Sequence, residues 1–195
     1  MAGTSLKTAE STPKRDLLLD TAADLFYRDG YHAVGIDTIL AEAGLAKMTL
    51  YHHFSSKEEL IIAALERRSR KIGVALGATL EAAGPSPRKR LLALFDWHEA
   101  WFASKEFNGC AFIRAVGEYP DPKSPIHQAV IKHKQAARDR LEVLLKEMGV
   151  ASPAKRAIQV HLLLEGAIVG AHTFGDPLII KSAREAAWVL IKASE

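Results

Sequence analysis

Cysteine and long apolar runs are nearly absent from this sequence of 195 residues. Its single cysteine, Cys110, has no intramolecular partner for a disulfide, which fits a reducing compartment. No run of 18 or more apolar residues occurs, and residues 1–13 lack the apolar core of a signal peptide. We therefore expect a cytoplasmic protein with no membrane partner.

Enzyme signatures are also missing. His98-Glu99 is not followed by the second histidine of a zinc-protease helix, and the sequence contains no phosphate-binding loop ending in Gly-Lys-Ser or Gly-Lys-Thr. No Gly-x-Gly-x-x-Gly follows a strand, and no serine has the flanking glycines of a hydrolase nucleophile. We expect no enzyme activity, no cofactor and no metal.

Patterns typical of β-strands are also missing, because no segment sustains the alternation of apolar and polar residues. Apolar residues instead recur at helical spacing along nearly the whole chain after residue 12. Glycines and prolines mark the breaks between helices. The spacing predicts an all-α fold of about nine helices, near residues 13–29, 36–43, 47–53, 57–83, 88–104, 110–118, 124–148, 153–174 and 178–193.

Two of these helices are short and joined by a tight turn that begins at Gly44, which is the helix-turn-helix pattern. In that motif one helix lies across the phosphate backbone while the second enters the major groove. Apolar residues would pack the pair onto the first helix: Ile39, Leu40, Leu50 and Phe54. The outer face of the second helix would then present donors and a methyl-contacting group to DNA: Lys47, Met48, Thr49, Tyr51, His52 and His53.

The positions of the charged residues support DNA binding, whereas the net charge alone does not. The net charge of +3 and a pI near 9.0 permit a nucleic-acid partner but do not require one. Residues 1–71 contain ten basic and ten acidic residues, yet no acid occurs between Gly44 and Lys57. The positive bias is therefore confined to the predicted DNA-reading helix and its flanks.

Five short strings in this region together resemble the signature of the TetR family of transcriptional regulators. They are AADLF at 22–26, GY at 30–31, ILAEAGL at 39–45, TLYHHF at 49–54 and KEEL at 57–60. The resemblance spans roughly residues 14–65 and implies that Lys47, Met48 and Thr49 lie near the bases. It further implies contacts to the sugar-phosphate backbone from Tyr51, His52, His53 and Lys57.

Two departures from the family pattern fall at helix starts. Gly35 and Ala46 stand where the family usually has a hydroxyl residue, so two groups that reach a phosphate are missing. Glycine is a tolerable N-cap and alanine a poor one. Tyr51 has an alternative role as a core aromatic. A metal pair at His52 and His53 is disfavoured, because adjacent helical residues point about 100° apart.

The remaining two-thirds of the chain is rich in aromatics between residues 95 and 112. Aromatics at helical spacing serve as core or as the walls of a pocket. Residues 107–113 (FNGCAFI), together with Glu118 and residues 120–122, resemble one subgroup of the TetR family, in which this domain encloses small, largely apolar effectors. The candidate wall residues are Phe95, His98, Trp101, Phe102, Cys110, Phe112, Ile113, His161 and Glu165. For Cys110, oxidant sensing and inert packing both remain open.

The last two predicted helices resemble the dimerisation pair of the family, in which two helices from each subunit form a four-helix bundle. Packing within a single chain is the alternative. The candidate interface consists of small residues and an apolar stripe: Gly166, Gly170, Ile179, Ala183, Ala186 and Leu190.

The domain organisation follows from these patterns, and the functional expectation is what the resemblance to the TetR family implies. We expect a disordered tail at 1–12, a DNA-binding domain at 13–70 and an effector-binding and dimerisation domain at 71–195. The chain would be a homodimeric repressor, bound to a palindromic double-stranded DNA operator and released by a small molecule. The alternative is a helical small-molecule-binding or scaffold protein that does not bind DNA.

Overall fold

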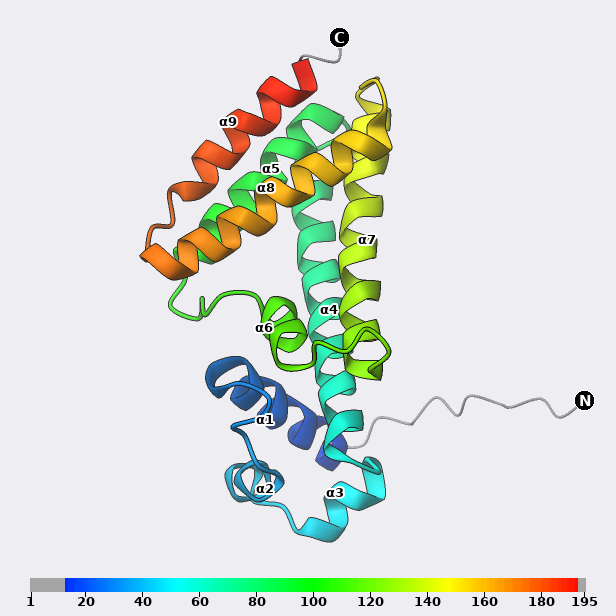
Figure 1. The fold of residues 1–195 in the computed structure, drawn as a ribbon, viewed down its shortest axis with the longest axis vertical. Helices are drawn as coiled ribbons and strands as arrows, with labels where there is room; N and C mark the ends of the chain where they lie inside the picture. Colours follow the sequence, from blue (N-terminus) through cyan, green and yellow to red (C-terminus); the bar gives the residue numbers. More distant parts are fainter. Residues whose placement is uncertain (1–12, 193–195) are drawn as a thin grey trace, which may run out of the picture. The chain divides into compact units, whose positions relative to one another are not determined.

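The computed structural model describes residues 13–192, and within that range it contains nine α-helices and no β-strand (Figure 1). The helices are α1 (Pro13–Asp29), α2 (Ile36–Ala43), α3 (Lys47–His53), α4 (Lys57–Ala82), α5 (Pro87–Phe102), α6 (Ala111–Glu118), α7 (Pro125–Glu147), α8 (Pro153–Phe174) and α9 (Ile179–Lys192). The all-α prediction is confirmed, with each helix end within about two residues of its expected place. The predicted tail lies outside the described residues.

Residue contacts divide the chain into two compact units, and the boundary falls inside α4, between Ala64 and Leu65. In the first unit, α1 packs against both α2 and α3. Its core is apolar, and the rings of Phe26 and Tyr31 stack with centroids 5.4 Å apart. Ile39, Leu50 and Phe54 are almost fully buried in this core, as the helix-turn-helix pattern requires.

The turn between α2 and α3 depends on Gly44, whose φ of 63° lies in the left-handed region. The backbone N–H of Gly44 donates to the carbonyl of Ala41, and that of Leu45 to the carbonyl of Leu40. Both bonds satisfy carbonyls that the end of α2 would otherwise leave unpaired. The chain therefore leaves α2 in a fixed direction and begins α3 after a turn of three residues.

Two serines and a glutamate cap the start of α4. Ser56 Oγ accepts a hydrogen bond of 3.1 Å from the backbone N–H of Glu59. The Glu59 carboxylate reaches back and accepts from both the backbone N–H and the hydroxyl of Ser55, each at 2.6 Å. These bonds join the first turn of α4 to both serines and fix the position at which the chain turns from α3 into α4.

The second unit holds its own hydrophobic core, to which α4, α5, α7, α8 and α9 all contribute. α8 packs along both α7 and α9, while α5 contacts α7, α8 and α9. By length and composition alone, α8 is apolar enough to cross a membrane. The buried core helix of a soluble protein passes the same test. Its side chains at 157, 160, 164, 167, 168 and 171 are buried in the core, which accounts for its apolar composition.

Candidate functional site

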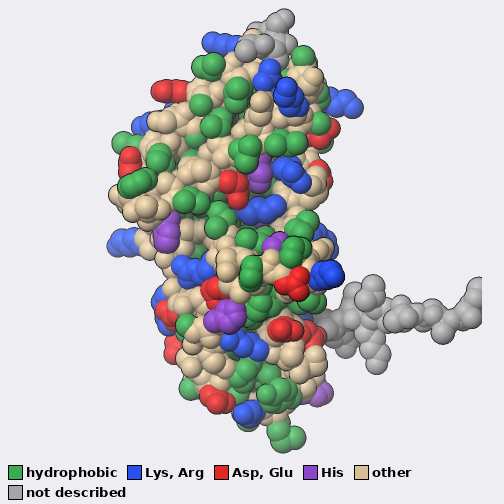
Figure 2. Space-filling model, viewed as in Figure 1, with side chains coloured by type: hydrophobic (Ala, Val, Ile, Leu, Met, Phe, Trp, Pro, Cys, Tyr) green, Lys and Arg blue, Asp and Glu red, His purple; other side chains and the backbone are tan. Residues whose placement is uncertain are grey.

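The outer face of α3 carries the side chains that the sequence assigns to DNA. Met48 is 86% exposed and Tyr51 is 53% exposed, and Lys47 and His52 are exposed beside them. Hydrophobic side chains accordingly protrude at the lower end of Figure 2, where α3 lies. Tyr51 is therefore a surface residue and not part of the core. Thr49 and His53 lie half-buried at the edges of this face.

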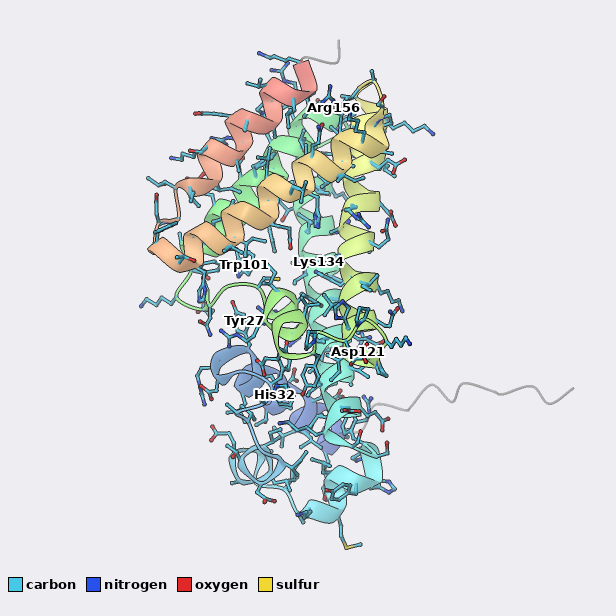
Figure 3. All side chains as sticks on the ribbon, viewed as in Figure 1. Tyr27, His32, Trp101, Asp121, Lys134 and Arg156 are labelled. Atoms are coloured by element: carbon cyan, nitrogen blue, oxygen red, sulfur yellow. The ribbon has the colours of Figure 1, made fainter. Side chains whose placement is uncertain are left out.

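Two lysines flank the face, and each has a partner in the first unit. Lys47 Nζ lies 3.6 Å from an Asp37 carboxylate oxygen, and both side chains are mostly exposed. Lys57 Nζ donates to the backbone carbonyl of His32 at 3.4 Å, and His32 is labelled in Figure 3. An exposed ion pair of this kind contributes little to stability, so a phosphate can compete for the Lys47 ammonium.

The two adjacent histidines have different surroundings. Their rings meet edge to face, with centroids 4.8 Å apart. Burial lowers the pKa of His53, and the nearby His52 and Arg15 lower it further. His53 is therefore neutral near pH 7, so it offers DNA a hydrogen-bonding ring rather than a charge.

Neither Gly35 nor Ala46 provides a side-chain cap, so α2 and α3 begin without the usual hydroxyl.

The second unit encloses a cavity of about 100 Å³, lined by α4, α5, α7, α8 and the segment around α6. Of the expected wall residues, six line it: His98, Trp101, Cys110, Phe112, His161 and Glu165. Three others are not among its lining residues: Phe95 and Phe102 are buried in the core, and Ile113 packs against that core.

The sequence reading missed the polar side of the cavity, which comes from α4 and α7. The additional lining residues there are Arg68, Ser69, His133, Lys134 and Arg140. A signal for α7 does exist in the sequence. His133 and Lys134 interrupt the apolar stripe that runs from Ile126 and Val130 to Leu141, so they stand where a helix normally faces its core.

A short ion pair crosses the cavity from α7 to α8. Lys134 Nζ lies 2.7 Å and 2.6 Å from the two carboxylate oxygens of Glu165, and both side chains are largely buried. The same ammonium lies 3.5 Å from the Cys110 sulfur. Trp101 and Lys134, both labelled in Figure 3, line this cavity from α5 and α7.

Two cavity histidines are held neutral. His98 Nδ1 lies 2.8 Å from the carbonyl of Leu94; a carbonyl only accepts, so Nδ1 carries the proton and Nε2 is left as an acceptor. Burial lowers the pKa of His98 to about 4. His133 stacks on Phe112 with centroids 3.5 Å apart and pairs with Ser69 Oγ at 2.8 Å. Burial and neighbouring cations lower its pKa to about 4 as well.

The expected interface residues fall into two groups. Gly166 is exposed, and a Cβ placed there would meet no atom within 4 Å. Gly170 is buried, and a Cβ there would lie 2.5 Å from Ile179 Cδ1 of the same chain. Ala183 is also buried within the chain, whereas Ala186 and Leu190 are half-buried. Gly170, Ile179 and Ala183 therefore belong to the packing of α8 on α9 in one subunit.

A further set of apolar side chains surrounds Gly166 on the exposed face of α8. Ile158, Leu162 and Val169 are each between 46% and 64% exposed and recur at helical spacing. Hydrophobic side chains are visible in Figure 2 over the upper part of the molecule, where α8 lies in front. A single subunit thus leaves an apolar stripe on α8 uncovered.

Comparison with known proteins gives consistent matches. Residues 18–64 match the profile of the family described as "Bacterial regulatory proteins, tetR family". The crystal structure of a TetR-family transcriptional regulator from Streptomyces coelicolor is 34% identical, with a TM-score of 0.87 over 94% of this chain and 90% of that one. The HTH-type transcriptional regulator YjdC of Escherichia coli is 28% identical over 155 residues, covering 80% of this chain and 81% of that protein.

The N-terminal region matches further regulators on its own. The HTH-type transcriptional activator FasR of Mycolicibacterium smegmatis is 50% identical over 54 residues, which are 28% of this chain and 25% of that protein. The resemblance read from residues 14–65 is therefore confirmed by comparisons made with the sequence and with the fold.

Proposed function

Because the chain belongs to the tetR family of bacterial transcriptional regulators, we propose that it is a repressor that holds a palindromic operator as a homodimer until a small molecule releases it. It is a DNA-binding regulator of transcription and not an enzyme. Such a regulator acts where the chromosome lies, so we place it in the cytoplasm. The cavity of the second unit is the proposed effector site.

The observation that carries the DNA-binding part is the outer face of α3. Leu50 anchors the helix from beneath, and this leaves Lys47, Met48 and Tyr51 facing outward. In the proposed complex Lys47, Met48 and Thr49 lie nearest the base edges, where sequence is read. The backbone contacts come from Tyr51, His52, His53 and Lys57.

Lys57 provides the most direct test of this geometry. It is the first residue of α4, where the helix N-terminus favours an anion such as a phosphate. Each phosphate neutralised by a lysine contributes about −0.9 to the slope of log K against log salt concentration. With two copies in a dimer, Lys57→Ala should flatten that slope by roughly two units, for operator and random DNA alike.

The measurement is a salt titration of operator and random DNA by fluorescence anisotropy. Lys57→Arg serves as the control, because it keeps the positive charge and should keep the slope. An unchanged slope for Lys57→Ala would remove this residue from the interface. If neither DNA binds the unaltered protein at low salt, the alternative of a ligand-binding protein that does not meet DNA is favoured.

Asp37 should limit DNA affinity from the same face. Its carboxylate lies 3.6 Å from Lys47 Nζ and competes with phosphate for that ammonium. Asp37→Asn removes one negative charge per subunit, so affinity for operator and random DNA should rise several-fold at low salt and less at high salt. Asp24→Asn removes the same charge from an exposed position on α1 and should have a smaller effect. Equal affinities for Asp37→Asn and the unaltered chain would contradict the proposed role.

A further inference from the structure

The cavity of the second unit has an uneven charge, and this bears on what it binds. Its lining contains three basic side chains, Arg68, Lys134 and Arg140, but only one carboxylate, that of Glu165. Glu165 is already paired with Lys134 at 2.6 Å. Beyond this pair, Arg140 of α7 adds a positive charge to the cavity lining.

Arg140 is the basic group best placed to receive a ligand. Among residues 13–192, no carboxylate lies within ion-pair distance of its guanidinium, and no hydrogen bond to its side chain is present. The guanidinium faces Gly73 of α4, where an added Cβ would lie 4.0 Å from Nη2. Ala136 and Ala137 also line this part of the cavity with small side chains. Arg140 therefore lines the cavity among small residues, and no carboxylate of residues 13–192 neutralises its guanidinium.

The neighbouring groups reinforce this arrangement. Ser69 contributes a hydroxyl, which lies 2.8 Å from His133 Nδ1. After burial, the basic side chains of Lys134, Arg140 and Arg68 lower the pKa of His133, together with His161. The electrostatic potential at this end of the cavity is therefore positive, which favours an anionic ligand group.

Apolar side chains of α5 and α8 also line the cavity. Trp97 and Trp101 have ring centroids 5.8 Å apart, and Leu94 and Ile168 line the cavity with them. Flat aromatic surfaces of this kind bind the face or edge of another ring. The cavity has a volume of about 100 Å³ and is partly open to solvent, so a compact molecule can enter it.

We propose that the effector is a small organic acid, with its carboxylate bound by Arg140 beside Ser69 and an aromatic or similarly flat body packed on Trp97 and Trp101. The inference rests on the proposed role of this cavity as the effector site. It differs from the largely apolar ligand that the resemblance to one TetR subgroup implies, because it adds an anionic group to the apolar body. A guanidinium binds a carboxylate through two parallel hydrogen bonds, which a neutral amide cannot reproduce.

The test compares acids with their neutral counterparts on the full-length protein. Benzoate and phenylacetate are titrated beside benzamide and phenylacetamide at constant ionic strength, by calorimetry and by the shift in Tm. The acids should bind at least about tenfold more tightly than the amides, because a charge-assisted pair is lost with the amide. Equal affinity of acids and amides, or no binding of either acid at millimolar concentration, overturns the proposal.

Variants locate the anion site. Arg140→Gln should weaken binding of the acids at least about tenfold and leave any amide binding unchanged. Arg138→Gln is the matched control, because it removes a nearby charge on α7 that does not line the cavity. Gly73→Leu is a second test, in case Arg140→Gln does not fold. It keeps the guanidinium but places a bulky side chain against it, so it should abolish acid binding. Unchanged acid binding in a folded Gly73→Leu protein would overturn the placement.

Operator binding, measured separately, distinguishes this inference from the proposed function. If the acids bind at Arg140 but never change operator affinity, the anion site stands and release by an effector at this site fails. If neutral molecules release the operator and the acids do not bind, the proposed function stands and the anion site fails.

Discussion

Gly166→Arg is expected to leave a folded chain that is monomeric and has lost most of its operator affinity. A Cβ at Gly166 meets no atom within 4 Å, so one subunit has room for the new side chain. Arginine also has a higher helix propensity than glycine, by roughly 0.5–1 kcal/mol. The isolated subunit should therefore be as stable as before.

The dimer should not tolerate the same change. Gly166 lies among the exposed apolar residues Leu162 and Val169 of α8, the stripe that we propose is covered by a second subunit. A guanidinium buried there without a partner costs about 3–5 kcal/mol, which is a factor of at least about a hundred in the dimer dissociation constant. Loss of two-site attachment should weaken operator binding by a further factor of about 10²–10⁴.

The control is Gly77→Arg, at a second exposed helical glycine with open space around it. Gly77 lies on α4 and not on the apolar stripe of α8, so Gly77→Arg should remain dimeric. Sedimentation velocity gives the oligomeric state, and circular dichroism confirms that both variants fold. A Gly166→Arg protein that stays dimeric and binds the operator would place the interface elsewhere.

The fold could be predicted from the sequence because its determinants are local. Gly44 adopts a left-handed conformation after α2, and Pro87, Pro125 and Pro153 each occupy the first position of a helix. These residue types act within one turn of the chain, so a single sequence reveals them. The outward face of α3 was predictable for the same reason, since periodicity alone separates Leu50 from Tyr51.

The polar side of the cavity and the partners of the small residues were not predictable in this way. A charged residue such as Arg140 normally marks a solvent-facing position, and only the packing of α4 beside α7 shows that it lines a cavity. Small residues indicate that two helices approach closely, but they do not identify the partner helix. Gly170 fits Ile179 of its own chain, whereas Gly166, one turn earlier, is left exposed.

Mild acid should destabilise the second unit strongly, because His98 and His133 must take up protons as the pH falls. Their pKa values in the folded chain are about 4, against an ordinary value of 6.5. Between these two values the unfolded chain binds more protons than the folded one, so stability is lost as the pH falls from about 6.5 to about 4. At pH 5 each histidine should cost about 2 kcal/mol, or about 4 kcal/mol together, out of a typical 5–15 kcal/mol.

Tryptophan fluorescence follows this effect selectively, because all three tryptophans, Trp97, Trp101 and Trp188, belong to the second unit. Urea unfolding at fixed protein concentration should show a falling midpoint between pH 7 and pH 5. Replacing either histidine with glutamine should remove about half of that dependence, whatever it does to stability at pH 7. His172→Gln, at an exposed position on α8, is the matched control. The same pH dependence in the His98→Gln, His133→Gln and unaltered proteins would contradict this account, because ordinary carboxylates titrate mainly below about pH 4.5.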